Sequence, residues 1–173
     1  SLSQFSLKFI SLLDEKLYNL YILLNSPIIK SNHLPIYLIK PRQNELIQLK
    51  QLTSYLSSIG LYFGFIKKGF FFLSLEGAEF LYRNKHILEK NQIIVTIQAE
   101  KSILYGNNIL KKMLSNFSME LKINDLVIVL NELKEIIAIG IIKVNGNDFY
   151  NLESDDIIAL NLIDKGYYLR KNQ

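Results

Sequence analysis

The sequence contains no cysteine and no tryptophan, and only two of its 173 residues are histidine. Without cysteine the chain has no disulfide, no thiol nucleophile and no zinc–thiolate site. His33 and His86 lie far apart, and neither belongs to an HxH or HExxH spacing. The sequence therefore predicts neither a metal site nor histidine-dependent catalysis.

The glycines are few as well. The eight of them form neither a GxGxxG nor a GxxxxGK[ST] pattern, so no dinucleotide or P-loop fingerprint is present. The adjacent carboxylates Asp155 and Asp156 would point to opposite faces of a strand, and a solvated turn explains them better than general acid–base catalysis. We expect a protein that is not an enzyme and needs no cofactor.

Long apolar runs are also lacking. The most apolar stretch, residues 61–75, is interrupted by Lys67 and Lys68, and falls short of the roughly 18 uncharged residues that a membrane helix needs. No signal peptide is recognisable at the start. We expect a cytoplasmic protein with no membrane partner.

The charge is unevenly distributed. The net charge is +4, but residues 1–90 hold eleven Lys and Arg against six Asp and Glu, whereas residues 91–173 hold nine against ten. A polyanion would find its average attraction in the first half. Binding by the second half would need a local cluster of cations.

The first half mixes helical and strand patterns. Apolar residues spaced by three and four predict helices over residues 3–24 and 43–57. Strands are predicted at 36–40 and, as a hairpin, at 61–66 and 70–74, followed by a helix over 77–84. The polar segment 84–91 is the predicted boundary between a domain of residues 1–90 and one of residues 91–173.

The second half is predicted to contain short strands spaced by about ten residues. They cover 93–98, 125–130, 136–144, 157–162 and 167–170, with a loop and short helix within 99–112. Asn145 and Gly146 predict a two-residue turn leading to Phe149 and Tyr150. The expected fold class is α+β, with an N-terminal α/β domain containing a small antiparallel sheet and a C-terminal β-barrel.

One loop combines the groups that bind single-stranded nucleic acid. Tyr105 offers a stacking face, Gly106 a flexible backbone, and Asn107 and Asn108 amides that can contact bases or phosphates. We expect cations from other parts of the domain to join this loop in a groove. The candidates are Lys111, Lys112, Lys143, Arg170 and Lys171.

Three segments of the second half resemble PUA domains, the RNA-binding modules of pseudouridine synthases and archaeosine transglycosylases. They are Leu104–Asn107 with the apolar pair behind it, Asp125 with the strands at 127–129 and 138–140, and the segment from Asp164 to Arg170, which resembles the closing strand. Together with Gly60, Gly64 and the aromatic run that follows, the whole chain resembles an archaeal-type member of the Nip-seven family of ribosome-biogenesis factors.

The resemblance implies a monomeric, non-catalytic factor in maturation of large-subunit ribosomal RNA. Its PUA domain would bind single-stranded, U- or AU-rich pre-rRNA, and its partners would be preribosomal proteins and the exosome. Met113 stands where the family usually has glycine. Met113 and the acidic balance of residues 91–173 leave open a protein-interaction adaptor with little direct RNA binding. An accessory subunit of an RNA-modifying enzyme also stays open, because PUA domains often accompany catalytic domains.

Overall fold

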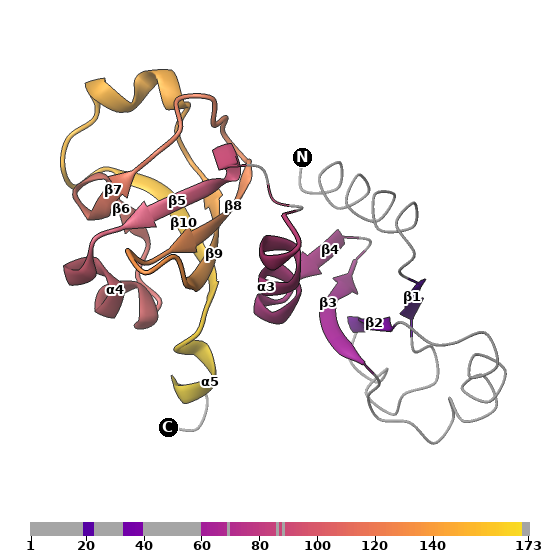
Figure 1. The fold of residues 1–173 in the computed structure, drawn as a ribbon. Helices are drawn as coiled ribbons and strands as arrows, with labels where there is room; N and C mark the ends of the chain where they lie inside the picture. The colour runs from indigo at the N-terminus through magenta and orange to yellow at the C-terminus, as the bar shows by residue number, and fades with distance from the viewer. Residues whose placement is uncertain are drawn as a thin grey trace, which may run out of the picture. The chain divides into compact units, whose positions relative to one another are not determined.

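The computed structural model describes residues 19–22, 33–39, 60–68, 70–85, 87 and 89–170 (Figure 1). The chain divides into two compact units, residues 1–77 and 78–173. The division falls within helix α3 (Leu75–Arg83), a few residues before the polar segment 84–91.

The first unit contains a four-stranded antiparallel sheet. Its strands are β1 (Asn19–Ile22), β2 (His33–Ile39), β3 (Leu61–Lys67) and β4 (Phe70–Leu73), and they lie in the order of the sequence. The predicted aromatic hairpin is confirmed, because β3 pairs with β4 in antiparallel register. Phe65 and Phe72 stack across this hairpin with ring centroids 5.0 Å apart.

The helix predicted over residues 3–24 is wrong at its end. Asn19–Ile22 forms strand β1, since its backbone pairs with Ile36–Ile39 of β2, and this pairing overrides the local helical spacing. The rest of that prediction, and the helix predicted over 43–57, lie outside the described residues.

Helix α3 begins where strand β4 ends. The Ser74 hydroxyl accepts a hydrogen bond from the Gly77 N–H at 2.9 Å and donates one to the Tyr62 carbonyl at 2.7 Å. Ser74 thus caps the helix and ties its start to the sheet.

The second unit contains a six-stranded, nearly closed sheet. The strand order is β6-β10-β9-β8-β5-β7, and every pair is antiparallel except β5 with β8. The strands are β5 (Gln92–Val95), β6 (Ile109–Leu110), β7 (Leu114–Asn116), β8 (Leu126–Leu130), β9 (Ile136–Ile142) and β10 (Ile157–Asp164).

Short helical segments connect these strands. Helix α4 (Ile97–Leu104) follows β5, and α5 (Tyr167–Arg170) follows β10. The 3-10 segments are η2 (Glu89–Asn91), η3 (Lys111–Met113) and η4 (Gly146–Asn151).

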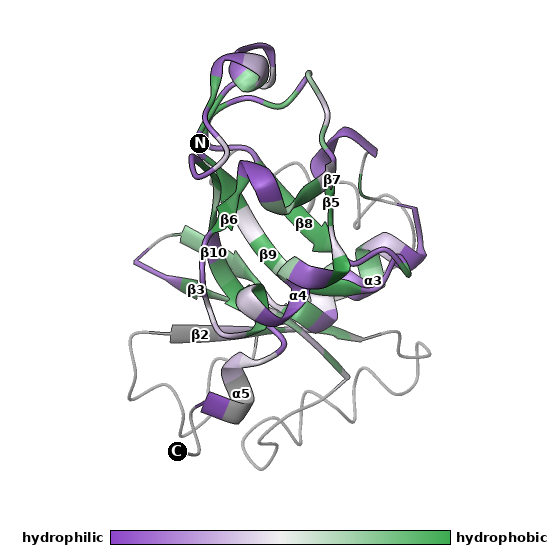
Figure 2. Cartoon of the chain, turned by 90° about the vertical axis from the view of Figure 1, so that its left-hand side faces the viewer, coloured by the Kyte–Doolittle hydropathy of each residue, from purple (hydrophilic) through white to green (hydrophobic). Residues whose placement is uncertain are grey.

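The core of the second unit lies inside the curved sheet. Every residue of β8 is buried, and the strands are largely apolar while their connections are largely polar (Figure 2). Helix α4 contributes Ala99 and Ile103 to this core. The core therefore fixes which face of α4 turns outward.

The strand predicted over 167–170 is wrong, since these residues form helix α5. The Arg170 N–H bonds to the Gly166 carbonyl, and the Arg170 side chain turns back onto Asp164. Strand β10, which lies between β6 and β9 in the sheet, ends before Lys165.

The hairpin turn predicted at Asn145–Gly146 is also wrong. The chain enters η4 there, and Phe149 stacks on Phe117 with centroids 4.8 Å apart instead of starting a strand. Gly146 donates its N–H to the Leu121 carbonyl, and a Cβ at this position would overlap the backbone of Met119. Close backbone packing, not a left-handed turn, explains the glycine.

In the part of the chain that the structure describes, no helix has the length and apolar character that crossing a membrane requires.

Candidate nucleic-acid interface

Helix α4 presents two different faces. Ala99 and Ile103 pack into the core. The opposite side carries a stripe at i, i+3, i+4 and i+7, the spacing that aligns side chains on one helix face. This stripe consists of Ile97, Glu100, Lys101 and Leu104.

The stripe forms one wall of an open cavity of about 630 Å³. Lys165, Gly166 and Arg170, which follow strand β10, form another wall, and Tyr105 completes the lining. Ile97 and Leu104 make part of the lining apolar. The cavity therefore joins two segments that are about 60 residues apart in the sequence. Its volume lies within the range that is usual for ligand sites.

The loop after α4 turns sharply at Gly106. This residue has φ +88° and donates its N–H to the Ile103 carbonyl, as expected for a glycine at the end of a helix. The Gly106 backbone lies against the Arg170 guanidinium, so that a Cβ would come within 3.1 Å of Nη2. The adjacent Tyr105 side chain is 64% exposed, which leaves its ring available for stacking.

Arg170 holds the two walls together. Its Nη1 and Nη2 donate to both carboxylate oxygens of Asp164 at 2.9 and 2.8 Å, and Nη1 also donates to the Leu104 carbonyl at the end of α4. The Asp164 side chain is only 3% exposed. A bidentate pair of this kind fixes both distance and orientation.

The ion pair with Asp164 affects the pKa of Arg170. The hydrogen bonds that Arg170 donates to Asp164 raise the pKa of Arg170 above its ordinary value, burial opposes the shift, and the charge of Asp164 adds to it. Because the pKa is raised on folding, the arginine contributes its stabilisation below its unfolded pKa and loses it only at strongly alkaline pH.

The two asparagines of the loop make internal hydrogen bonds. Asn108 Oδ1 accepts from the Asn161 N–H, and Asn107 Nδ2 donates to Ser102 Oγ at 3.0 Å. Asn161 Nδ2 in turn donates to the carbonyls of Ile103 and Asn107. These amides set the shape of the loop, and only Asn107 leaves its side chain largely at the surface.

Lys111 and Lys112 lie at the other end of strand β10. Their N–H groups donate to Asp156 and Ser154, just before the strand, whereas Lys165 and Arg170 follow it. Eight strand residues at about 3.3 Å each separate the two ends by about 25 Å.

Both of these lysine side chains have partners. Lys111 Nζ donates to the Leu152 carbonyl at 2.6 Å and lies 5.2 Å from the Phe149 ring centroid. Lys112 Nζ pairs with Asp155 at 2.5 Å, although both side chains are largely exposed. An exposed pair of this kind exchanges readily.

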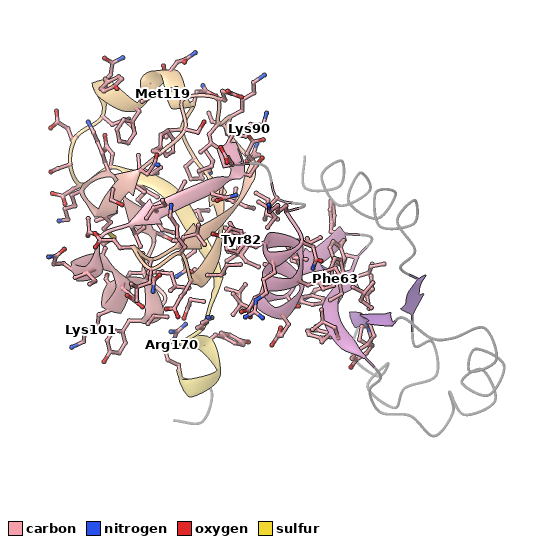
Figure 3. All side chains as sticks on the ribbon, viewed as in Figure 1. Phe63, Tyr82, Lys90, Lys101, Met119 and Arg170 are labelled. Carbon is pink, nitrogen blue, oxygen red and sulfur yellow. The ribbon has the colours of Figure 1, made fainter. Side chains whose placement is uncertain are left out.

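The predicted site residues therefore separate into two groups. Tyr105 and Arg170 line the cavity, and Gly106 lies against the Arg170 guanidinium. Lys143 is exposed and donates its N–H to Ile158, at the same end of β10 as Lys111 and Lys112. Lys171 lies outside the described residues. Figure 3 shows Lys101 and Arg170 at one end of this unit and Met119 at the other.

The sequence analysis missed three charged residues of the cavity, namely Glu100, Lys101 and Lys165. Lys101 lies four residues before Tyr105 on the outward stripe of α4, and this spacing could have identified it. Nothing in the sequence indicates Lys165, because only the fold brings the end of β10 to α4. Among the described residues no group of three or more His, Asp or Glu side chains could hold a metal ion.

The nearly closed six-stranded sheet, with a helix after its first strand and a cavity beside that helix, has the architecture of a PUA domain. Residues 91–173 match the family model described as the UPF0113 PUA domain. A UPF0113 protein of Archaeoglobus fulgidus is 33% identical over 100 residues, which are 58% of this chain and 55% of that protein. The match thus spans about half the length of this relative.

Two solved structures share the fold. One is a conserved PUA domain protein from Thermoplasma acidophilum, with 17% identity and a TM-score of 0.52 over 76% of this chain and 96% of that one. The other is a hypothetical protein from Pyrococcus horikoshii OT3, with 14% identity and a TM-score of 0.53 over 78% and 69%. The predicted PUA-type fold is confirmed, while the narrower resemblance to Nip-seven proteins stays a prediction.

Proposed function

We propose that this protein is a non-catalytic RNA-binding factor, and that its PUA domain binds single-stranded RNA at the cavity beside helix α4. One observation carries the proposal. Two exposed lysines, Lys101 and Lys165, and the exposed ring of Tyr105 surround one partly apolar cavity. Cations beside an aromatic face are the usual platform for a single strand.

Each group has a distinct role in this proposal. Lys101 and Lys165 contact phosphates, which determine affinity without reading sequence. A base stacks on Tyr105, a contact worth about 1–3 kcal/mol. Arg170 already donates to Asp164 and Leu104, so it positions the walls of the cavity.

The second group of cations serves longer RNA. The segment from Gly106 to Leu110 runs beside strand β10 from the cavity towards Lys112. A single-stranded RNA that follows this edge of the sheet would reach Lys112 and Lys143. One of its phosphates would replace Asp155 as the partner of Lys112.

The cellular role that we propose is large-subunit ribosome biogenesis, with binding to U- or AU-rich pre-rRNA in the cytoplasm. The resemblance to Nip-seven proteins and the UPF0113 match support it. Crosslinking of RNA to the protein in cells, followed by sequencing, should recover pre-rRNA. Partners that persist after nuclease treatment, without any RNA crosslink, would favour the adaptor function instead.

Binding should depend on salt through the two cavity lysines. In titrations of labelled U-rich RNA at several salt concentrations, the Lys101→Ala, Lys165→Ala double variant should bind more weakly. The slope of log K against log salt should fall by about 1.4, because each phosphate contact on a single strand contributes about 0.7.

A matched double variant controls for the loss of two charges. Lys90 and Lys122 belong to the same unit, and Figure 3 shows Lys90 away from the end that carries Lys101 and Arg170. The Lys90→Ala, Lys122→Ala variant has the same net charge as the cavity variant and should keep the wild-type slope. Equal losses in both variants would refute the cavity as the binding site.

A further inference from the structure

Glu100 is the only acidic side chain among the described residues that line the cavity. It lies on the outward stripe of α4, next to the proposed phosphate contact Lys101 and one turn after Ile97. A carboxylate here repels phosphate, so it weakens the general attraction that the neighbouring lysines provide. A site that bound only the RNA backbone would gain nothing from it.

The carboxylate of Glu100 has unused capacity as an acceptor. Its Oε1 accepts one long hydrogen bond, 3.5 Å, from Asn131 Nδ2. No ion pair within the described residues joins it to Lys101, Lys165 or Arg170. A carboxylate has about four acceptor positions, so most of those on Glu100 remain available to a ligand.

Asn131 donates the hydrogen bond to this carboxylate from the turn between β8 and β9. The Asn131 side chain is buried, its Oδ1 accepts from the Glu135 N–H at 2.9 Å, and its Nδ2 also donates to Glu135 Oε2 at 2.9 Å. The amide is therefore fixed by the turn between β8 and β9. Asn131 Nδ2 therefore gives Oε1 of Glu100 a fixed partner, and helix α4 fixes the Cα of Glu100.

We infer that Glu100 reads a guanine base in the cavity, an inference that rests on the RNA-binding function proposed above. Guanine alone among the four RNA bases presents two adjacent donors, N1–H and the N2 amino group, on its Watson–Crick edge. Both can donate to one carboxylate. Uracil, by contrast, presents a single N3–H between two carbonyls, which a carboxylate repels.

The assignment gives the two kinds of group in the cavity separate tasks. Lys101 and Lys165 hold phosphates of any sequence, Tyr105 stacks on any base, and Glu100 selects one base at one position. The U- or AU-rich preference implied by the Nip-seven resemblance then applies to the flanking nucleotides. A site built to bond two donors rejects a base that lacks them.

The test compares labelled pentamers that differ only at the centre: UUGUU, UUAUU, UUUUU and UUIUU, where I is inosine. The wild-type protein should prefer UUGUU over UUUUU by roughly 10- to 100-fold, and inosine, which lacks the N2 amino group, should lose roughly 10-fold. The Glu100→Gln variant should bind UUGUU more weakly and UUUUU at least as tightly as the wild type, because it removes a repelling charge. A merely structural role for Glu100 would not move these two affinities in opposite directions.

Glu132→Gln is the matched control, since Glu132 is exposed in the turn between β8 and β9 and does not line the cavity. It should keep the preference for guanine. Equal wild-type affinity for all pentamers, with binding still lost in the Lys101→Ala, Lys165→Ala variant, would overturn the role of Glu100 and leave the proposed function intact. Absence of binding to every pentamer and to longer U-rich RNA would overturn both.

Discussion

The Gly166→Ala variant should bind U-rich RNA at least roughly 10-fold more weakly than the wild type, because it disrupts the cavity. A Cβ at Gly166 would overlap the Leu104 carbonyl and crowd Nη1 of Arg170. The carbonyl belongs to the backbone of α4 and cannot rotate away, so the two walls must separate. Loss of the stack on Tyr105 alone accounts for a decrease of this size.

Gly146→Ala is the matched comparison for this variant. Its Cβ would overlap the Met119 backbone, which Figure 3 places at the opposite end of the unit from Arg170. Both substitutions overpack a close backbone contact and should lower the free energy of unfolding by about 1–3 kcal/mol. Thermal denaturation measures that shared cost, and RNA titration below the transition temperature separates the two variants. Equal RNA affinities for the two would contradict a cavity between α4 and α5.

The second large effect concerns the Asp164–Arg170 pair. Arg170→Ala leaves a nearly fully buried carboxylate without its cation, and Asp164→Ala removes the group that orients the guanidinium. Each single variant should lower the midpoint of thermal unfolding by roughly 10 °C, because breaking one side of a buried pair is strongly destabilising. Amide exchange in residues 165–170 should rise in both.

The double variant decides whether the two residues act together. If they do, Asp164→Ala, Arg170→Ala should lose less than the sum of the two single losses. The exposed pair of Arg83 with Glu79, at 2.6 Å on α3, is the control. Arg83→Ala should change the midpoint by no more than about 2 °C. Strictly additive losses would show that Asp164 and Arg170 act independently, and would contradict a stabilising pair between them.

Local patterns predicted much of the fold. Two aromatic-rich runs around a short turn identified the hairpin of β3 and β4, and the continuous apolar runs identified β8 and β9, because both signals lie within the segment itself. The errors occurred where a distant partner decides the structure. Asn19–Ile22 becomes a strand because β2 pairs with it, and Tyr167–Arg170 becomes a helix that Asp164 anchors.

The candidate site was only partly predictable for the same reason. Tyr105 and Gly106 were recognisable because an aromatic, a glycine and two amides follow one another in the sequence. The approach of Lys165 to α4 depends on where β10 ends, and no local signal encodes that. The spacing of Glu100 and Lys101 on one helix face was readable, but its meaning required knowing which face the core of the barrel covers.

The clamp that Arg170 makes across the cavity has a consequence for synthesis of the chain. Helix α4 and its tyrosine emerge from the ribosome early in production of the barrel, but the residue that locks them in place comes about 65 residues later. A nascent chain therefore carries only one wall of the cavity while it is still being translated, and the cavity is complete only after α5 has formed and Arg170 has bonded to Leu104.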